Sequence, residues 1–125
     1  MLRLSVCIEA LFNKIPYPER IKKSAELGAP AFEFWGWSNK NLDELKRAKD
    51  EAGIEVATFS CEVGSPLVSS GNREKIIDGT KRSIEAARKM DCKRLLVTTG
   101  NEIAGVSRAE QHKSIVEHLK AVAGL

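Results

Sequence analysis

The sequence has few of the features that assign a protein to a class at first sight. Its three cysteines, Cys7, Cys61 and Cys92, have no C-x-x-C spacing, which argues against both a disulfide framework and a structural zinc site. No apolar run approaches the roughly 20 residues needed to span a bilayer. Arg3 and Glu9 interrupt the N-terminal apolar stretch, which is therefore too short for a signal peptide. We expect a cytoplasmic chain with free thiols and no membrane partner.

Strong charge and phosphate-binding motifs are also lacking. The net charge is only +3, and the basic residues are interspersed with acidic ones, so nothing indicates a nucleic-acid partner. Neither G-x-x-x-x-G-K-[ST] nor G-x-G-x-x-G occurs, which leaves loop 64–72 with only a weak signal for phosphate binding. His112 and His118 lie six positions apart on one helical segment, which is not a one-face ligand spacing. We expect structural or surface roles for them, with His112 in the apolar stripe and His118 on a more polar flank.

The sequence does contain a regular alternation of strand and helix patterns. The 125 residues, 42% of them hydrophobic, are enough for one domain over 1–125 with a core of its own. Capping-box spacing at Asn41 and Ser107 marks the starts of two helices. Strand patterns cover 2–8, 31–37, 54–60 and 93–100, and the helices that follow them open near Pro18, Asn41, Asn72 and Ser107. The sequence therefore predicts four consecutive βα units.

Such an alternation predicts an α/β fold with a parallel sheet. Central strands of a doubly wound sheet are apolar on both faces, whereas these strands mostly have one apolar face and one small or polar face. The opposed pairs are Phe32 and Phe34 against Glu33 and Trp35 in the second strand, and Ala57 and Phe59 against Thr58 and Ser60 in the third. Only the fourth strand is apolar on both sides. The chain is also about half of the roughly 250 residues of an eightfold barrel. We therefore expect half of a (β/α)8 TIM barrel, with an open four-stranded parallel sheet as the alternative.

Candidate substrate-binding residues lie on the polar strand faces and at the carboxyl ends of the strands, where barrel enzymes place their chemistry. They are Glu33, Trp35, Ser60, Glu62, Gly100 and Asn101. Each also has a structural interpretation that the sequence leaves open. Glu33 could form a buried ion pair with Arg3 or Arg94, and Glu62 could be a solvated loop carboxylate. The Gly100–Asn101 pair is equally typical of a turn.

Several stretches resemble a known family. "EALFNKIPYPERIKKSAELGAPAFEFWGW", "AGIEVATFS" and "DCKRLLVTTGN" resemble the N-terminal half of the xylose-isomerase-like TIM barrels, nearest to the hydroxypyruvate isomerase and sugar isomerase/epimerase branch. The resemblance implies an isomerase or epimerase of small hydroxy-carbonyl compounds or sugars. It also implies a divalent metal, Mg or Mn, that stabilises an enediolate while a carboxylate transfers the proton.

The resemblance assigns no catalytic or metal-ligating residue in this chain. In the family those residues lie largely on strands five to eight, beyond the four strands expected here. Two hypotheses follow. The chain is an isomerase-like half-barrel, inactive alone, that works when two chains close a barrel or the other half is supplied. Alternatively, it is a noncatalytic βα domain that self-associates. Unpaired first and fourth strands favour a homodimer in either case.

Overall fold

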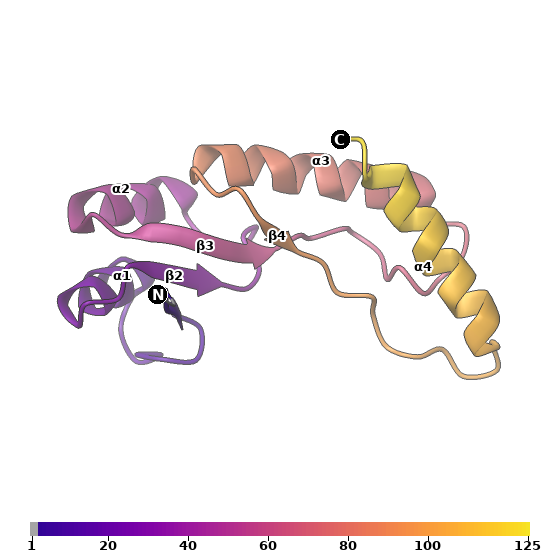
Figure 1. The fold of residues 1–125 in the computed structure, drawn as a ribbon, viewed down its shortest axis with the longest axis horizontal. Coiled ribbons are helices and arrows are strands. Elements are labelled where there is room, and N and C mark those ends of the chain that lie inside the picture. The colour runs from indigo at the N-terminus through magenta and orange to yellow at the C-terminus, as the bar shows by residue number, and fades with distance from the viewer. Residues whose placement is uncertain (1–2) are drawn as a thin grey trace.

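The computed structural model describes residues 3–125, in which four strands alternate with four helices (Figure 1). The strands are β1 Ser5–Cys7, β2 Ala31–Phe34, β3 Glu55–Ser60 and β4 Leu95–Leu96, and the helices are α1 Tyr17–Glu26, α2 Leu42–Ala52, α3 Arg73–Lys89 and α4 Arg108–Val122. Residue 2, the first of the expected strand 2–8, lies outside the described residues. No described helix is both long enough and apolar enough to cross a membrane.

The four strands pair in parallel in the order β1-β2-β3-β4. A doubly wound sheet reverses its strand order at a switch point, whereas a barrel adds each strand beside the one before it. Consecutive order with crossovers of one hand also places the helices on one face of the sheet. The predicted run of βα units is therefore confirmed, in the arrangement of a barrel wall.

The hydrophobic core lies between the helices and one face of the sheet. Phe32, Phe34 and Phe59 are at most 2% exposed, and the rings of Phe34 and Phe59 stack with centroids 4.7 Å apart. The opposite face of β2 has no such cover, since Glu33 is half-buried and Trp35, just after the strand, is 62% exposed. The alternation predicted for the second strand is thus confirmed, with its apolar side toward the core.

The third and fourth strands are less regular than predicted. Because the β2–β3 register shifts between Phe32 and Glu33, Val56 rather than Ala57 joins Phe59 in the core. Strand β4 has only two residues, of which Leu95 packs against the core while Leu96 is 51% exposed. The uncovered face of the sheet is therefore polar along β2 and apolar along β4.

Of the two predicted capping boxes, only the one at Ser107 is complete, since Asn41 supplies just its own half, and the cap expected at Asn72 does not form. The Asn41 side chain accepts hydrogen bonds from the second and third N–H groups of α2, and Ser107 and Glu110 form a complete capping box on α4. Asn72 occupies the N-cap of α3 but makes no capping bond, because its side-chain amide donates to the Ser70 carbonyl at 3.4 Å.

The two histidines have structural and surface roles, but their expected places on α4 are exchanged. His118 is 5% exposed and its Nδ1 lies 2.9 Å from the Leu67 carbonyl, whereas His112 is exposed. Figure 1 shows α4 standing at the far end of the molecule from α1 and α2, beside α3. It packs against α3 and buries a polar face formed by Gln111, Ser114 and His118, of which Gln111 binds the segment before α4 and His118 meets the loop after β3.

Candidate functional site

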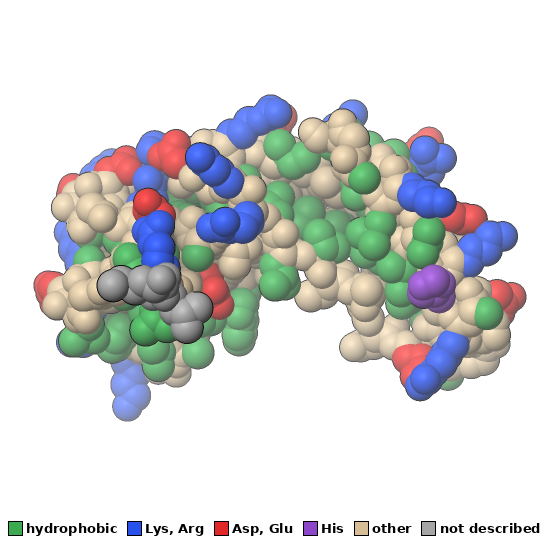
Figure 2. Space-filling model, in the orientation of Figure 1, with side chains coloured by type: hydrophobic (Ala, Val, Ile, Leu, Met, Phe, Trp, Pro, Cys, Tyr) green, Lys and Arg blue, Asp and Glu red, His purple; other side chains and the backbone are tan. Residues whose placement is uncertain are grey.

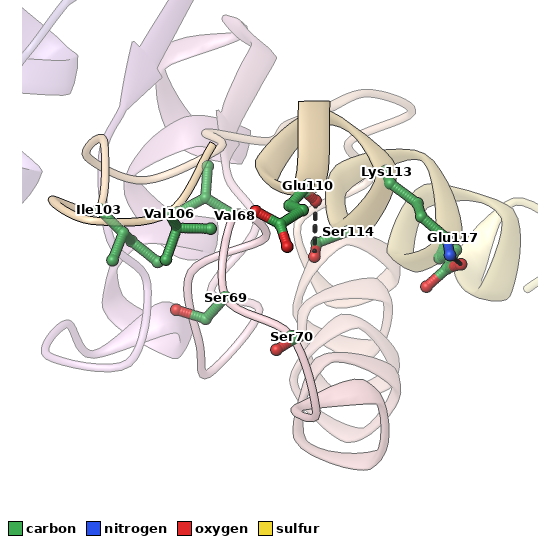
Figure 3. A pocket seen from close by; sticks show the side chains of 9 residues that line it. All are labelled: Val68, Ser69, Ser70, Ile103, Val106, Glu110, Lys113, Ser114 and Glu117. Atoms are coloured by element: carbon green, nitrogen blue, oxygen red, sulfur yellow. Dashed lines mark hydrogen bonds and ion pairs between the residues drawn. The ribbon is translucent and has the colours of Figure 1, made fainter. Parts of the chain in front are cut away.

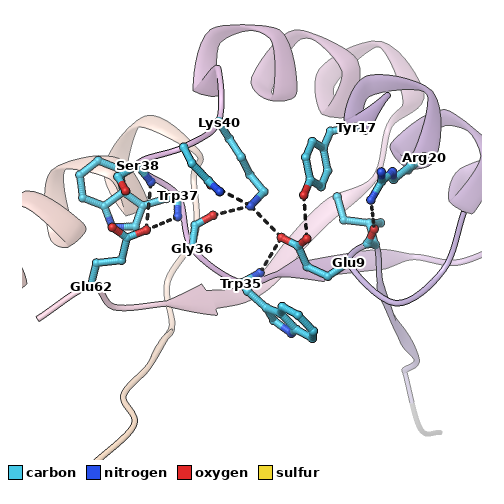
Figure 4. A network of polar contacts seen from close by, with 11 residues as sticks. Glu9, Tyr17, Arg20, Trp35, Gly36, Trp37, Ser38, Lys40 and Glu62 are labelled. Atoms are coloured by element: carbon cyan, nitrogen blue, oxygen red, sulfur yellow. Dashed lines mark hydrogen bonds and ion pairs between the residues drawn. The ribbon is translucent and has the colours of Figure 1, made fainter. Parts of the chain in front are cut away.

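The carboxyl ends of β1, β2 and β3 meet at one end of the sheet, where a polar network surrounds turn 35–38 (Figure 4). Two carboxylates accept hydrogen bonds from this turn on opposite sides. Glu9 follows β1 and Glu62 follows β3, so each reaches the turn from a strand that neighbours β2. Parallel pairing in consecutive order brings these three segments together.

Glu9 is the centre of one half of the network. Its carboxylate accepts hydrogen bonds from the Tyr17 hydroxyl at 2.7 Å and the Trp35 N–H at 3.2 Å, and it forms an ion pair with Lys40 Nζ at 2.7 Å. Lys40 also donates to the Gly36 carbonyl at 2.6 Å. The side chains of Lys40 and Glu9 are only 2% and 10% exposed. This is a buried ion pair whose two partners also bind the backbone of the turn and the Tyr17 hydroxyl.

The surroundings of Glu9 act on its pKa in opposite directions. Burial raises the pKa of this carboxyl, whereas hydrogen bonds from Lys40, Tyr17 and the Trp35 N–H lower it, and the net effect is a lowered pKa. The hydrogen bond between Tyr17 and Glu9 also raises the pKa of Tyr17, because the Tyr17 hydroxyl donates to a carboxylate. Glu9 is therefore charged in the folded protein at neutral pH.

Glu62 occupies the other side of the turn. Its Oε1 accepts hydrogen bonds from the N–H groups of Trp37 at 2.6 Å and Ser38 at 3.0 Å. Burial raises the pKa of Glu62, but these contacts more than offset that effect and lower it. Gly36 permits this approach, because a Cβ there would lie 2.8 Å from Oε1. Glu62 is thus a backbone-binding carboxylate and not a solvated loop residue.

Ser83 of α3 ties the same turn to the helix layer. Its hydroxyl accepts from the Trp37 indole N–H at 3.0 Å and from the Glu62 backbone N–H at 2.9 Å, and donates to the Gly79 carbonyl at 2.9 Å. Ser83 is fully buried. The indole of Trp37 is therefore fixed, while that of Trp35 extends away from the network in Figure 4.

Four of the predicted site residues lie on or beside this turn. Trp35 belongs to it, Glu62 binds its N–H groups, and Ser60 donates its backbone N–H to the Trp35 carbonyl at 3.3 Å. Glu33 lies two residues before Trp35 on the uncovered face of β2. None of the ion pairs among residues 3–125 includes Glu33, because Arg3 pairs with Glu55 at 3.0 Å instead.

The other two predicted residues lie apart from the turn. Gly100 and Asn101 are exposed in the segment that joins β4 to α4. Gly100 has a φ of +94°, and a Cβ there would lie 2.7 Å from the Cβ of Pro66, so a left-handed backbone conformation and a close approach to the loop after β3 account for the glycine. The structure records no hydrogen bond between these two residues and turn 35–38.

Sequence reasoning missed Glu9, Tyr17 and Lys40. One signal was available, because Glu9 follows directly on the first strand pattern, at the strand end where barrel enzymes place their chemistry. Lys40 gave no signal, since a lysine before a helix N-cap is ordinarily solvated. Only the tertiary structure shows that its ammonium group meets Glu9.

The described residues do not form a metal site. Among residues 3–125 there is no group of three or more His, Cys, Asp or Glu side chains placed to hold one ion. Both oxygens of Glu9 are engaged by Tyr17, the Trp35 N–H and Lys40, and Oε1 of Glu62 already accepts two backbone N–H groups. Mg or Mn at this site would need ligands from outside the described residues.

A separate cleft of about 510 Å³ lies between the loop after β3 and the start of α4 (Figure 3). Val68 and Val106 form part of its apolar side, and Glu110 and Lys113 part of its charged side. Glu110 is used in the capping box, and Lys113 lies 3.9 Å from Glu117. Ser69 and Ser70 also line the cleft, so it combines an apolar side with hydroxyl and charged groups.

Comparison with known proteins agrees with this geometry. Residues 21–125 match the family model described as "Xylose isomerase-like TIM barrel". The chain belongs to this family. The resemblance noted in the sequence is thereby confirmed, and so is the interpretation of the sheet as half of a barrel.

The curated relatives carry a narrower name. The chain is 27% identical to a putative hydroxypyruvate isomerase of Danio rerio and 26% identical to the hydroxypyruvate isomerase of Escherichia coli K12. The matches include 99% and 100% of this chain but 49% and 51% of the relatives. The chain therefore spans about half the length of the curated relatives it matches.

Solved structures show the same half-length relationship. The fold superposes on an AP endonuclease of family 2 from Brucella melitensis with a TM-score of 0.90 at 21% identity, covering 99% of this chain and 50% of the other. A sugar phosphate isomerase/epimerase from Parabacteroides distasonis gives a TM-score of 0.77 at 12% identity, covering 98% and 46%. At these identities the likeness concerns the fold alone.

Proposed function

We propose that the chain forms half of the substrate-binding wall of an isomerase or epimerase acting on small hydroxy-carbonyl compounds or sugars. The observation that carries this proposal is the network at the strand ends. Three adjacent strand ends of a family barrel position one polar turn beside a sheet face that no helix covers. Family membership and the names of the curated relatives support the reaction class.

In this proposal the chain binds and orients the substrate, and the proton transfer needs additional groups. Trp35, Glu33 and Ser60 face the space that a closed barrel would enclose, whereas Glu9 and Glu62 are committed to the turn. A base beside the substrate carbon and ligands for Mg or Mn would come from a second βα unit. The chain alone would then have no isomerase activity.

A second copy of the chain could supply that unit. Both outer strands, β1 and β4, lack a neighbour on one side among the described residues, and free edges favour pairing with another chain. Apolar side chains also lie open to solvent near β4 and on α4, including Leu96 at 51%, Val97 at 39% and Leu119 at 41%. Figure 2 shows hydrophobic side chains around the hollow in the middle of the molecule. Two copies would give the eight strands of a closed barrel.

We expect the purified chain to be a homodimer in solution. Size-exclusion chromatography with light scattering, with and without Mg²⁺ or Mn²⁺, would measure its mass. Leu96→Lys should shift the protein to monomer, because it places a charge on the exposed edge strand. Leu27→Lys is the matched control, since Leu27 is 71% exposed just after α1 and should leave the mass unchanged. A wild-type monomer at every concentration would contradict the proposal.

A dimer would then be assayed for isomerisation of hydroxypyruvate and of small sugars in the presence of the metal. Turnover would support the enzymatic proposal. A dimer without turnover would favour the second candidate function, a noncatalytic half-barrel that self-associates. The observation that favours this second candidate is that the described residues contain no cluster of metal-ligating side chains.

A further inference from the structure

A second cleft, of about 440 Å³, lies between the start of α3 and the last turns of α4. Figure 1 shows these two helix ends beside each other, at the far end of the molecule from α1 and α2. The volume is within the range of small-molecule sites. None of the residues that line the cleft belongs to the network at turn 35–38. They are Gly71, Arg73, Glu117, His118, Lys120 and Ala121.

His118 is the buried polar group of this cleft. It is 5% exposed, and its Nδ1 lies 2.9 Å from the Leu67 carbonyl oxygen. Because a carbonyl oxygen can only accept a hydrogen bond, Nδ1 carries a proton and donates it. Among residues 3–125 no group pairs with Nε2, yet no fully enclosed side-chain nitrogen or oxygen lacks a partner. Nε2 is therefore the part of the ring that is open to the cleft.

The charged groups around His118 decide what its Nε2 can bind. Arg73, the first residue of α3, and Lys120, in the last turn of α4, contribute two cations to the lining. Glu117 contributes one carboxylate, which lies 3.9 Å from Lys113, and the loop before α3 contributes only Gly71. The lining is therefore net positive. An anion beside Nε2 favours the imidazolium form, in which Nε2 is a second N–H donor.

The start of α3 adds to this positive character. Asn72 occupies the N-cap position, but its side-chain amide donates to the Ser70 carbonyl and leaves the helix without a side-chain cap. The first N–H groups of a helix have no acceptor within the helix and carry partial positive charge. Phosphate groups bind at such helix starts. In this cleft an uncapped helix start therefore coincides with Arg73, Lys120 and the open nitrogen of a buried histidine.

We infer that this cleft binds the phosphate group of a small phosphate monoester. His118 donates to a phosphate oxygen from Nε2, and the planar guanidinium of Arg73 suits two further oxygens. Lys120 supplies a third positive charge. The volume of the cleft leaves room for the organic part of the molecule beside its phosphate. The inference is independent of the proposed function, because it uses no residue of turn 35–38.

NMR of the histidine rings tests the site on the full chain. His112 and His118 are the two histidines of the sequence, so the signals of the two rings can be followed separately. Titration with glycerol phosphate should shift the His118 signals saturably. The His112 signals should stay unchanged, because His112 is exposed and does not line the cleft. His112→Asn assigns the signals and should leave the affinity unchanged. His118 signals that do not respond would overturn the site.

Inorganic phosphate is the second probe, and it separates the two sources of a phosphate group. Weaker binding of inorganic phosphate than of glycerol phosphate would support a monoester site, because the organic part then adds contacts within the cleft. Equal affinity for the two probes would overturn the monoester as the ligand and identify free phosphate in its place.

Charge variants distinguish a built site from general attraction of anions. Arg73→Gln should weaken glycerol phosphate binding about tenfold, the usual loss for one charge-assisted contact. Arg82→Gln is the matched control, because Arg82 lies on the same helix, pairs with Asp78 at 3.1 Å and does not line the cleft. Glu117→Gln should strengthen binding, since it removes the lining carboxylate. Equal losses in the two arginine variants would overturn the site.

The donor role of His118 predicts that binding depends on pH. Affinity should fall as the pH rises through roughly 5 to 8, the range in which an imidazole loses its proton. Sulfate is the probe here, because it keeps its charge over this range whereas phosphate groups titrate within it. His118→Gln, which offers a neutral amide donor, should remove the pH dependence. Sulfate affinity that is constant with pH in the wild type would overturn the role of His118.

Discussion

Replacing Lys40 by methionine is expected to lower the free energy of unfolding by about 3–5 kcal/mol, the usual effect of breaking a buried ion pair from one side. The side chain of Lys40 is only 2% exposed, and its loss would leave the carboxylate of Glu9 buried without its cation. Urea unfolding at neutral pH would measure the change. Lys46→Met is the matched control, with a much smaller expected effect on the free energy of unfolding, because its ion pairs are solvent-exposed.

The pH dependence of this variant distinguishes lost charge pairing from lost packing. The pKa of Glu9 is lowered in the folded protein from an ordinary value of 4.5, so its contribution to stability is present above that value and is lost as the pH falls through the folded pKa. Without Lys40, burial acts on Glu9 with less opposition and raises its pKa. The stability difference between wild type and variant should therefore be largest near neutral pH and shrink in acid. A difference that stays constant with pH would indicate lost packing alone.

A double variant gives an independent check on the same pair. Adding Glu9→Gln to Lys40→Met removes the uncompensated charge, so we expect part of the lost stability to return. The glutamine introduced by Glu9→Gln would still accept the hydrogen bond from the Tyr17 hydroxyl in this background. Glu9→Gln is also measured in the wild-type background. If it lowers the free energy of unfolding by the same amount there and in the Lys40→Met background, the two residues act independently and the ion-pair account is wrong.

The fold could be predicted from the sequence because its determinants are local. The apolar alternation of Phe32 and Phe34 and the caps at Asn41 and Ser107 each depend on residues a few positions apart. The face that α4 buries could not be predicted in the same way. Its apolar stripe indicates a helix, but its position beside α3 and the loop after β3 buries His118 and leaves Leu119 41% exposed. That choice depends on tertiary neighbours.

The candidate site could be predicted only in part, for a similar reason. Trp35 and Glu62 were found because polar or aromatic residues at strand ends stand out against the alternating pattern. The pairing of Glu9 with Lys40 joins residues 31 positions apart, and no periodic signal connects them. Glu62 stays a predicted substrate-binding residue, and no signal in the sequence indicated that its Oε1 binds the backbone N–H groups of the turn.

Replacing Gly79 by alanine is the other substitution with a large expected effect. Within a helix such as α3, Gly→Ala ordinarily stabilises by about 1 kcal/mol. Here the new Cβ would lie 2.5 Å from the carbonyl oxygen of Glu62 and 2.7 Å from that of Val63, which are backbone atoms that no rotamer change can move. We expect a net loss of about 2–3 kcal/mol, as for overpacking of a well-packed site. Thermal and urea unfolding would show this loss as a variant less stable than the wild type, whereas helix propensity alone predicts a more stable one.

The same substitution also tests how the helix layer supports the turn. Gly79 lets the backbone at Glu62 lie directly on α3, beside the Ser83 hydroxyl that binds both Glu62 and Trp37. Pushing that backbone away should lengthen the contacts from Glu62 to the N–H groups of the turn. Gly124→Ala is the control, since a Cβ there meets no atom within 4 Å. If Gly79→Ala instead gains stability, as helix propensity alone would predict, the close contact between α3 and the β3 strand end does not constrain the site.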